Sequence, residues 1–471
     1  MMRLPSVNIP ALFVLPFVLG SLAGCAFHGA RERVEHADAY LADQDELTRA
    51  VLGDRGALEL DDCVEIALDN NLDIESARIQ RRIADLERKT AFANFLPTLD
   101  LSMQYVTWDR QPKSKLFGPM AVPMHDQDMH ELTLDIQWPV FMPATWFLYD
   151  MRLRASEISE WITEYTRQMV VFQVTALYLK CLMLDEAAQA LSGRLKAAEA
   201  LEREVSAFVE EGLAASWQAD LAGALVLERR TSLRETQRFL EEARAELLAA
   251  MGLSPLAEIE LAPAITIEAP EKELDALVLE ALLNNPQLHI ADRKVAVEKD
   301  RLRLAIAEFL PKLAGFTSFS YTSNSKAAYS KSWMGGVQNL LTVFEGFANI
   351  SRYKAAREQR RAAYLERERA CLTLILQVIQ AHNSLENAGD YLELAEKRLD
   401  AALGKYADVE AQWHEGLVDL PARLEARADK DGAQAQVTSA TYQQQLAAAA
   451  LLNVMGAGYA GYEVRNYEDE L

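Results

Sequence analysis

The feature that most constrains this chain is a tandem duplication of its own sequence. The strongest identities lie 214 residues apart: Leu60-Asp61, Val64, Ala67-Leu68, Asn70-Asn71 and Ala77 recur as Leu274-Asp275, Val278, Ala281-Leu282, Asn284-Asn285 and Ala291. Later matches lie 204 residues apart: Glu211-Gly212-Leu213 recurs as Glu415-Gly416-Leu417, and Met251-Gly252 recurs as Met455-Gly456. A repeat of this length indicates one duplicated structural unit, although 471 residues alone would suggest two to four domains.

The two copies define the domain organisation. The chain is divided into a first repeat at 58–252, a linker at 253–272, a second repeat at 273–456 and a C-terminal tail at 457–471. Three prolines in the linker interrupt any helix. The offset between the copies falls only between Pro97 and Trp138, so we expect an exposed loop there that is longer in the first copy.

The amino terminus is similar to a bacterial lipoprotein signal. Arg3 supplies a small basic region, and a short apolar run ends in Leu22-Ala23-Gly24-Cys25. Small residues before a cysteine resemble the lipobox, in which the thiol is acylated; ordinary cleavage near a cysteine is the alternative. We predict a signal peptide at 1–24, a lipid (palmitate-type) anchor on Cys25 and an anchored segment at 25–57. Ala26, in place of aspartate, favours the outer membrane by the same resemblance.

Each copy contains two runs with the alternation of half-buried strands. The cleanest has Leu132, Leu134 and Ile136 on one face and polar residues between them. The predicted strands are about 98–108 and 131–141 in the first copy and about 313–322 and 333–344 in the second. Each run has the length of a tilted strand that crosses a membrane, whereas the alternative is a small soluble hairpin. Four strands cannot close a barrel, so spanning strands require several chains, and three chains would give twelve.

Long helices fill most of each copy. The ranges 147–210 and 347–415 contain no proline, and their mixed three- and four-residue apolar spacing is typical of helices that pack as coiled coils. Gly212 and Gly416 are expected to end them. Return helices are predicted at 216–251 and 419–455. The expected fold is therefore mainly α, with long helical hairpins that form the wall of a water-filled tube and a transmembrane β portion.

Composition and motifs exclude several functions. The net charge of −22 argues against a general nucleic-acid binder, because phosphate recognition needs clustered lysine and arginine. No phosphate loop, nucleophile elbow or HExxH motif occurs, so we expect no enzyme and no cofactor. Residues 124–130 (Met124 to His130) superficially resemble a metal cluster, but polar residues are expected beside a hairpin loop, and no metal site is predicted. The remaining cysteines are expected to be free and buried.

These features together resemble the outer membrane efflux (TolC-like) family. The resemblance rests on the lipobox, the duplicated order of elements, the Ala281-to-Leu288 motif, the Phe-Leu-Pro triplets, Trp138 to Phe141 and the paired Gly-Leu turns. It covers nearly all of 58–456. It implies a homotrimer with a twelve-stranded β-barrel in the outer membrane and a long periplasmic α-helical barrel. The implied function is a passive exit duct in efflux or type I secretion, and the implied partners are a periplasmic adaptor and an inner-membrane transporter of the RND or ABC type.

The resemblance also implies site residues. The turns at Gly212-Leu213 and Gly416-Leu417 would form the periplasmic tip and contact the adaptor. Side chains after the second turn would line the pore aperture: Glu425, Pro421 and Asp419. Two departures from the family pattern are Glu211 and Glu415, which stand where an apolar residue is usual.

Other interpretations remain open for these residues. Glu425 is equally consistent with a solvated helix-surface charge, and Asp419 with a cap on the return helix. The competing function is a periplasmic adaptor or a structural coiled-coil lipoprotein. An adaptor is expected to show one coiled hairpin between split β-rich domains, and the tandem duplication argues against it.

Overall fold

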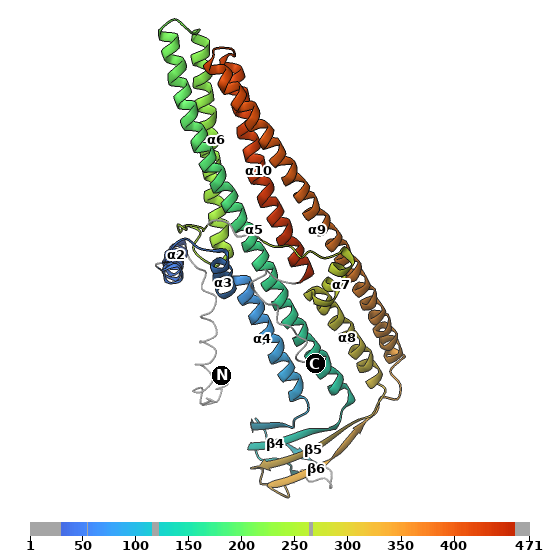
Figure 1. Cartoon of the computed structure of the whole chain (residues 1–471). Helices are drawn as coiled ribbons and strands as arrows, with labels where there is room; N and C mark the ends of the chain where they lie inside the picture. Colours follow the sequence, from blue (N-terminus) through green and yellow to red (C-terminus); the bar gives the residue numbers. More distant parts are fainter. Residues whose placement is uncertain (1–29, 54, 115–121, 263–266, 457–471) are drawn as a thin grey trace.

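The computed structural model describes residues 30–53, 55–114, 122–262 and 267–456. Long helices form an elongated body with helical turns at one end and a small sheet at the other (Figure 1). The predicted signal peptide, the predicted lipidation site Cys25 and the tail at 457–471 lie outside the described residues. The elongated shape separates the two ends that the sequence predicts to be functional.

The two copies fold into matching series of elements. The first repeat contains α3 (Leu60–Asn70), α4 (Leu72–Ala93), β1 (Thr98–Thr107), β4 (Asp128–Phe141), α5 (Pro143–Glu210) and α6 (Ser216–Ala250). The second contains α7 (Leu274–Asn284), α8 (Pro286–Ala307), β5 (Lys312–Thr322), β6 (Lys331–Leu340), α9 (Ala348–His414) and α10 (Leu420–Met455). An additional helix, α2 (Ala30–Leu52), precedes them, and the short strands β2 (Lys113–Ser114) and β3 (Val122–Pro123) pair within the longer loop of the first copy.

The four long strands form one antiparallel sheet in the order β1-β4-β5-β6. Each repeat contributes one hairpin, and β4 pairs with β5 to join the two copies. The strands β1 and β6 lie at the edges, with one side of each unpaired within the described chain. An unpaired edge presents main-chain donors and acceptors to any further strand, so this sheet is ready to be extended on both sides.

The strand boundaries differ from the predicted ones at two places. The strand β4 begins at Asp128 rather than near 131, because Asp128 pairs with Thr107 at the end of β1. The strand β6 ends at Leu340 rather than near 344, because Leu340 pairs with Lys312, the first residue of β5. Cross-strand partners therefore set the ends of these strands, and hydropathy alone does not show them.

The repeated asparagine and glycine residues join three helices in each copy. Asn71 caps α4 through its Oδ1, and its Nδ2 donates to the carbonyl oxygen of Ala250 at 2.8 Å. In the second copy Asn285 caps α8 in the same way, and its Nδ2 donates to the carbonyl oxygen of Val454 at 2.9 Å. The glycine after each return helix adopts a positive φ, 76° in the first copy. The motif recurs because the same main-chain junction recurs.

The main hydrophobic core lies around this junction, at the level of α3 and the end of α6. Tyr178 of α5 is almost fully buried there, and its hydroxyl donates to the carbonyl oxygens of Leu58 and Ala262 at 3.2 and 2.8 Å. Leu58 also pairs with Leu261 in a parallel bridge, so the linker is held against the first repeat. The long helix α5 has a stretch apolar enough to cross a membrane, but packing in this core accounts for it.

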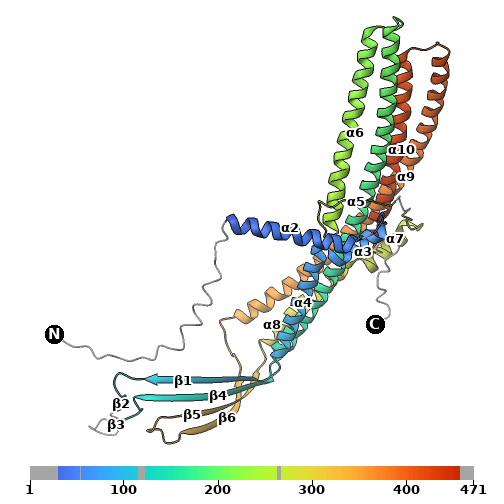
Figure 2. The same ribbon diagram turned by 90° about the vertical axis from the view of Figure 1, so that its left-hand side faces the viewer.

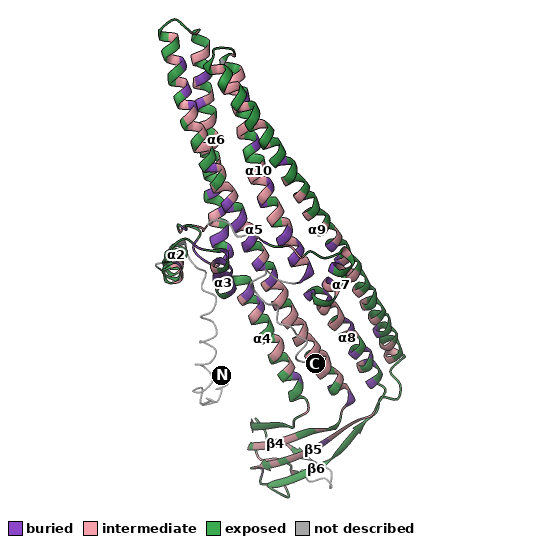
Figure 3. Cartoon of the chain, viewed as in Figure 1, coloured by how far each residue is buried: buried purple, intermediate pink, exposed green. Residues whose placement is uncertain are grey.

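Exposure increases from this core toward both ends (Figure 3). On β1, Leu101 and Met103 are 70% and 75% exposed, and on the same face of β6 Trp333 and Val337 are 73% and 69% exposed. Contiguous apolar surface of this kind marks a contact with membrane or with other protein. The described chain is therefore incomplete by itself as a water-soluble fold.

Candidate functional site

The two faces of the sheet differ in polarity. One face carries mainly apolar and aromatic side chains: Leu99, Leu101, Met103, Leu132, Leu134, Ile136, Trp138, Phe319, Tyr321, Trp333 and Val337. The other carries mainly polar ones: Asp100, Ser102, Gln104, Glu131, Thr133, Asp135, Gln137, Ser318, Ser320, Ser332 and Gln338. A sheet with one apolar and one polar face separates lipid from water when it is curved into a barrel.

The polar face carries an unfavourable pair of charges. Asp100 of β1 lies directly opposite Asp135 of β4 in the ladder, and Ser318 lies on the other side of Asp135. Neither aspartate has an ion-pair partner among the described residues. Like charges at directly opposed positions destabilise a sheet. Two unpaired carboxylates at these positions are therefore expected on a face that is in contact with water, which screens their repulsion.

The helical hairpins end in two similar turns. Gly212 and Gly416 have φ of 74° and 71°, conformations in which a glycine is favoured. Leu213 and Leu417 follow them, and their amides donate to the carbonyl oxygens of Phe208 and Gln412. Both leucines are about 70% exposed at the end of the molecule. The structure thus presents two matched apolar tips from the predicted adaptor-contact turns.

The three predicted aperture residues lie at the start of α10. Asp419 is the N-cap, and its carboxylate accepts a hydrogen bond from the Ala422 amide at 3.1 Å. Pro421 lies in the first turn of α10 and is exposed. Glu425 is also exposed, and its carboxylate lies 3.6 Å from the ammonium group of Lys405 on α9. The capping alternative for Asp419 is therefore observed, and Glu425 has a cationic neighbour.

A cluster around Arg423 was not predicted. The guanidinium makes two hydrogen bonds to Glu410 of α9, at 2.6 and 3.0 Å, and lies 3.5 Å from Glu204 of α5. It also lies over the ring of Trp413, 5.2 Å from the centroid. Arg423 holds the pKa of Glu410 below its usual value by hydrogen bonding, which keeps the carboxylate charged. The cluster links the turn of the second hairpin to the first.

Between the Arg423 cluster and the core, the two hairpins are joined along α5 and α10 at three further levels. Nearest the tip, Arg194 Nε lies 3.5 Å from the carboxylate of Asp431, and Nη2 donates to the carbonyl oxygen of Asp431. Both side chains are about 15% exposed. In the middle, the Tyr442 hydroxyl donates to Glu186 at 2.9 Å. Nearest the core, Gln168 donates to the carbonyl oxygen of Gly456 at 3.4 Å.

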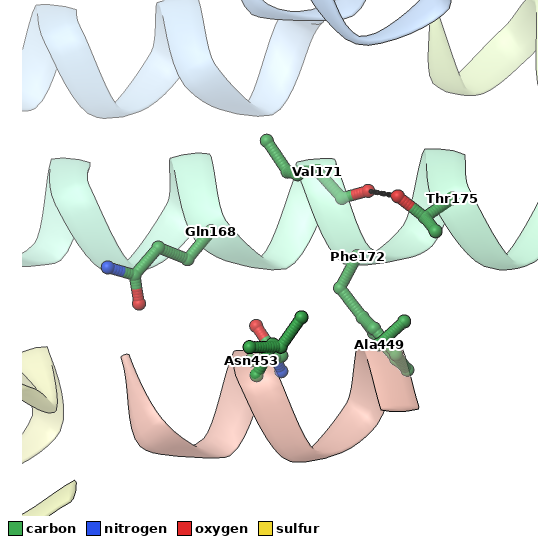
Figure 4. Close-up of a pocket in the computed structure, with 7 residues that line it drawn as sticks. Gln168, Val171, Phe172, Thr175, Ala449 and Asn453 are labelled. Atoms are coloured by element: carbon green, nitrogen blue, oxygen red, sulfur yellow. Dashed lines mark hydrogen bonds between the residues drawn. The ribbon is translucent and has the colours of Figure 1, made fainter. Parts of the chain in front are cut away.

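A small cavity lies between α5 and α10 at the level nearest the core. Gln168 and Thr175 lie along α5, and Asn453 lies opposite them on α10 (Figure 4). The space is about 20 Å³, enough for one water molecule. The Thr175 hydroxyl donates to the carbonyl oxygen of Val171 instead of pointing to a ligand. This cavity is a packing feature between the repeats and has no room for a solute.

Residues 124–130 join the two strand hairpins. Asn324 Nδ2 lies 3.1 Å from His125 Nδ1, and the Ser325 hydroxyl donates to Asp126 at 2.8 Å. The ring of His130 packs against Tyr105 at 5.0 Å between centroids. Within the described ranges no group of three or more histidine, cysteine, aspartate or glutamate side chains is placed to hold a metal ion. The polar side chains of this segment make structural contacts.

The three described cysteines are free. Burial raises the pKa of the Cys63 thiol to about 12, and that of Cys181 also to about 12. Both thiols are therefore protonated at neutral pH and unreactive. Cys371 on α9 is partly exposed. The prediction that these cysteines are free is confirmed. The prediction that they are buried is confirmed for Cys63 and Cys181 and is wrong for Cys371.

Comparison with known proteins places these features in one family. The sequence matches the family described as outer membrane efflux protein over residues 63–253 and again over 277–457. The chain belongs to the outer membrane efflux protein family. The resemblance drawn from the duplicated motifs is confirmed, and this family comprises channels rather than enzymes. Each match covers one copy of the duplication.

Curated relatives carry two kinds of name. "Cation efflux system protein CusC" of Escherichia coli K12 is 29% identical over 160 residues, which is 33% of this chain and only 35% of that protein. "Pyoverdine export outer membrane protein OpmQ" of Pseudomonas aeruginosa is 24% identical over 414 residues, 86% of each chain. The region of this chain that aligns with CusC thus spans about a third of the length of that protein.

Solved structures share the fold. The CmeC outer membrane channel of Campylobacter jejuni superposes with a TM-score of 0.76, covering 87% of this chain and 88% of that one at 16% identity. The outer-membrane channel OprN gives 0.74, covering 85% and 90% at 18% identity. The predicted fold class, long helical hairpins joined to a four-stranded β portion, is confirmed by these likenesses.

Proposed function

We propose that three copies of this chain form an outer-membrane duct through which solutes leave the periplasm. The observation that carries the proposal is the four-stranded sheet with two unpaired edges, one apolar face and one polar face. Pairing β1 of one copy with β6 of the next closes a twelve-stranded barrel without free edges. The apolar face then meets lipid, and the polar face lines the pore.

The helices extend this pore into the periplasm. The helix α5 has 68 residues and α9 has 67, so each is about 100 Å long at 1.5 Å per residue. Exposed leucines on both tip turns offer an apolar surface to a periplasmic adaptor. An inner-membrane transporter of the RND or ABC type, joined through this adaptor, supplies the energy. Cys25 anchors each copy to the membrane through acyl chains.

The duct does not choose the transported substrate. The names of relatives cite cations in one case and pyoverdine in another. These unlike solutes support a passive exit pathway whose specificity comes from the pump. The same duct serves either small-molecule efflux or protein secretion, depending on that pump.

The assembly is tested on the full chain expressed with its signal. We expect trimers in the outer-membrane fraction that migrate differently in detergent gels before and after heating, and stepwise conductance in planar bilayers. A soluble monomer without conductance would refute the duct and favour a structural coiled-coil lipoprotein.

Glu425 is proposed to bear on cation passage at the tip. Three symmetry-related copies of this carboxylate near the pore axis would attract cations, and Lys405 at 3.6 Å neutralises part of that charge. We therefore expect Glu425→Ala to weaken block by added divalent cations and to lower cation selectivity. The measurements are block and reversal potential in planar bilayers. Asp220→Ala, another acidic helix residue near the tip, is the control, and unchanged block and selectivity in Glu425→Ala would contradict the proposal.

Asp100 and Asp135 are expected to select cations in the barrel. The double variant Asp100→Asn with Asp135→Asn removes six carboxylates from one level of the trimer. We expect the cation-to-anion permeability ratio to fall about twofold or more, since fixed charges in a pore change the local potential by on the order of kT. The reversal potential in a salt gradient measures this ratio. Ser102→Asn, a neutral change on the same face of β1, should leave it unaltered.

A further inference from the structure

The helix α2 has an apolar stripe that the described chain leaves uncovered. Val34, Tyr40, Leu41 and Leu47 are between 36% and 60% exposed. The last turns are held against the core, where Thr48 is buried and accepts a hydrogen bond from the Ser254 amide at 2.9 Å. The rest of α2 projects away from the long helices (Figure 2). A helix with such a stripe is stable only when a partner covers it.

We propose that α2 packs along the first half of α9 in the neighbouring copy and straps the two protomers together. The inference rests on the proposed trimer and lipid anchor. Closing the barrel pairs β1 with β6 of the next copy. The helix α4 leads into β1, and α9 follows β6, so α4 of one copy comes beside α9 of its neighbour. The C-terminal end of α2 meets α3 beside the start of α4 (Figures 1 and 2), so α2 leaves the body at this same edge.

The facing surface of α9 has a matching pattern. Leu365, Leu372 and Leu376 are 53% to 69% exposed on the described chain. Leu365 and Leu372 are seven residues apart, as are Val34 and Leu41 on α2. Matched seven-residue spacing is the pattern of two helices that pack as a coiled coil.

Charge favours the neighbour's α9 over the chain's own α4. Exposed carboxylates follow the α2 stripe at Asp38, Asp43, Asp45 and Glu46, and none has an ion-pair partner among the described residues. On α9, Lys354 and Arg361 are exposed and likewise unpaired within the described chain. The basic residues of α4 are already paired: Arg78 and Arg82 with Glu75, Arg81 with Glu160, and Arg88 and Lys89 with Asp85. The acidic side chains of α2 can therefore form ion pairs with Lys354 and Arg361 on α9 of the neighbouring copy.

The length of the chain before α2 sets its direction. Four residues lie between Cys25 and Ala30, so the five residue-to-residue steps span at most about 17 Å when extended. The 22 residues of α4 place the junction between α3 and α4 about 33 Å from the sheet. A lipid on Cys25 therefore reaches the membrane only if α2, about 34 Å long, turns from the direction seen in Figure 2 so that its N-terminal end lies toward the sheet and its C-terminal end stays at the core. That direction makes α2 parallel to α9.

The test uses two differently tagged full-length chains expressed together, each with Cys371→Ser to remove the partly exposed native thiol. One carries Leu41→Cys and the other Leu372→Cys. After oxidation of isolated outer membranes, we expect a disulfide-linked product that contains both tags and disappears on reduction. The yield of this product should be about tenfold or more above that of the control, because two cysteines kept close together react at a high effective concentration. The matched control replaces Leu372→Cys with Leu394→Cys, an exposed leucine farther along α9.

Other outcomes separate the inference from the function on which it rests. Conducting trimers without the two-tag product would overturn the strap alone. A disulfide within one chain carrying Leu41→Cys and Ile83→Cys, and none between chains, would place α2 on its own α4 and also overturn it. Failure of the unmodified chain to form trimers or conduct would overturn the duct itself.

Discussion

Replacing Arg194 with alanine is expected to raise the basal conductance of the reconstituted channel roughly tenfold, because the two hairpins of each protomer separate more easily at the tip. Arg194 on α5 binds both the carboxylate and the main-chain carbonyl of Asp431 on α10. Burial lowers the pKa of the Arg194 guanidinium, and Asp431 opposes this by stabilising its charge. The pair links the two copies of the duplication where the helices approach the tip.

The size of the effect follows from burial and from what remains after the change. Removing one member of a buried ion pair costs about 3–5 kcal/mol, because the other charge stays unpaired. In the Arg194→Ala variant, Asp431 still has Lys430 at 3.7 Å, so we expect the smaller cost of about 2 kcal/mol. A cost of this size shifts an equilibrium by more than tenfold. Arg194→Lys keeps the charge but loses the two-point contact, and it should have a smaller effect.

Planar-bilayer recording of open probability measures this change. Arg230→Ala is the matched control, since Arg230 pairs with Glu199 at 3.2 Å within the first hairpin and both side chains are about 40% exposed. An exposed pair of that kind contributes about 0–1 kcal/mol. Equal conductance in Arg194→Ala and Arg230→Ala would show that the contact between hairpins does not hold the tip closed.

The sequence predicted those parts of the fold that depend on local main-chain geometry. Asn71 and Asn285 recur because each caps one helix and holds the end of another. Gly212 and Gly416 recur because each ends a long helix with positive φ. Such requirements act on one residue type at one position, so they are visible as a duplicated motif.

The contacts between distant helices were not predictable in this way. Arg194 and Asp431 are 237 residues apart, and nothing in their own helices distinguishes them from other charged residues. Arg423 was missed for the same reason, since its two partners lie on α9 and α5. Only the packing of α5 on α10 shows which of many surface charges meet.

Gly252→Ala is expected to be the most destabilising of three equivalent substitutions at positive-φ glycines. Gly252 has a φ of 76°, and a Cβ there would lie 2.3 Å from the carbonyl oxygen of Asn70. Because that atom belongs to the main chain, α3 must shift, which disrupts the hydrogen bond from Asn71 to Ala250 in the core. Backbone strain and lost packing together cost about 3–5 kcal/mol.

Alanine substitutions at the other two glycines are expected to cause smaller losses of stability. At Gly456 the nearest carbonyl oxygen, that of Asn284, lies 2.9 Å from the same added atom, so a smaller shift suffices. At Gly212 nothing lies within 4 Å, and Gly212→Ala should cost only about 1 kcal/mol from its positive φ. Thermal unfolding of the purified trimers, followed by circular dichroism, should rank the losses in that order, with a fall of about 5 °C or more for Gly252→Ala. Equal losses at all three positions would mean that φ alone matters and that the close approach of α3 to the end of α6 contributes no measurable stability.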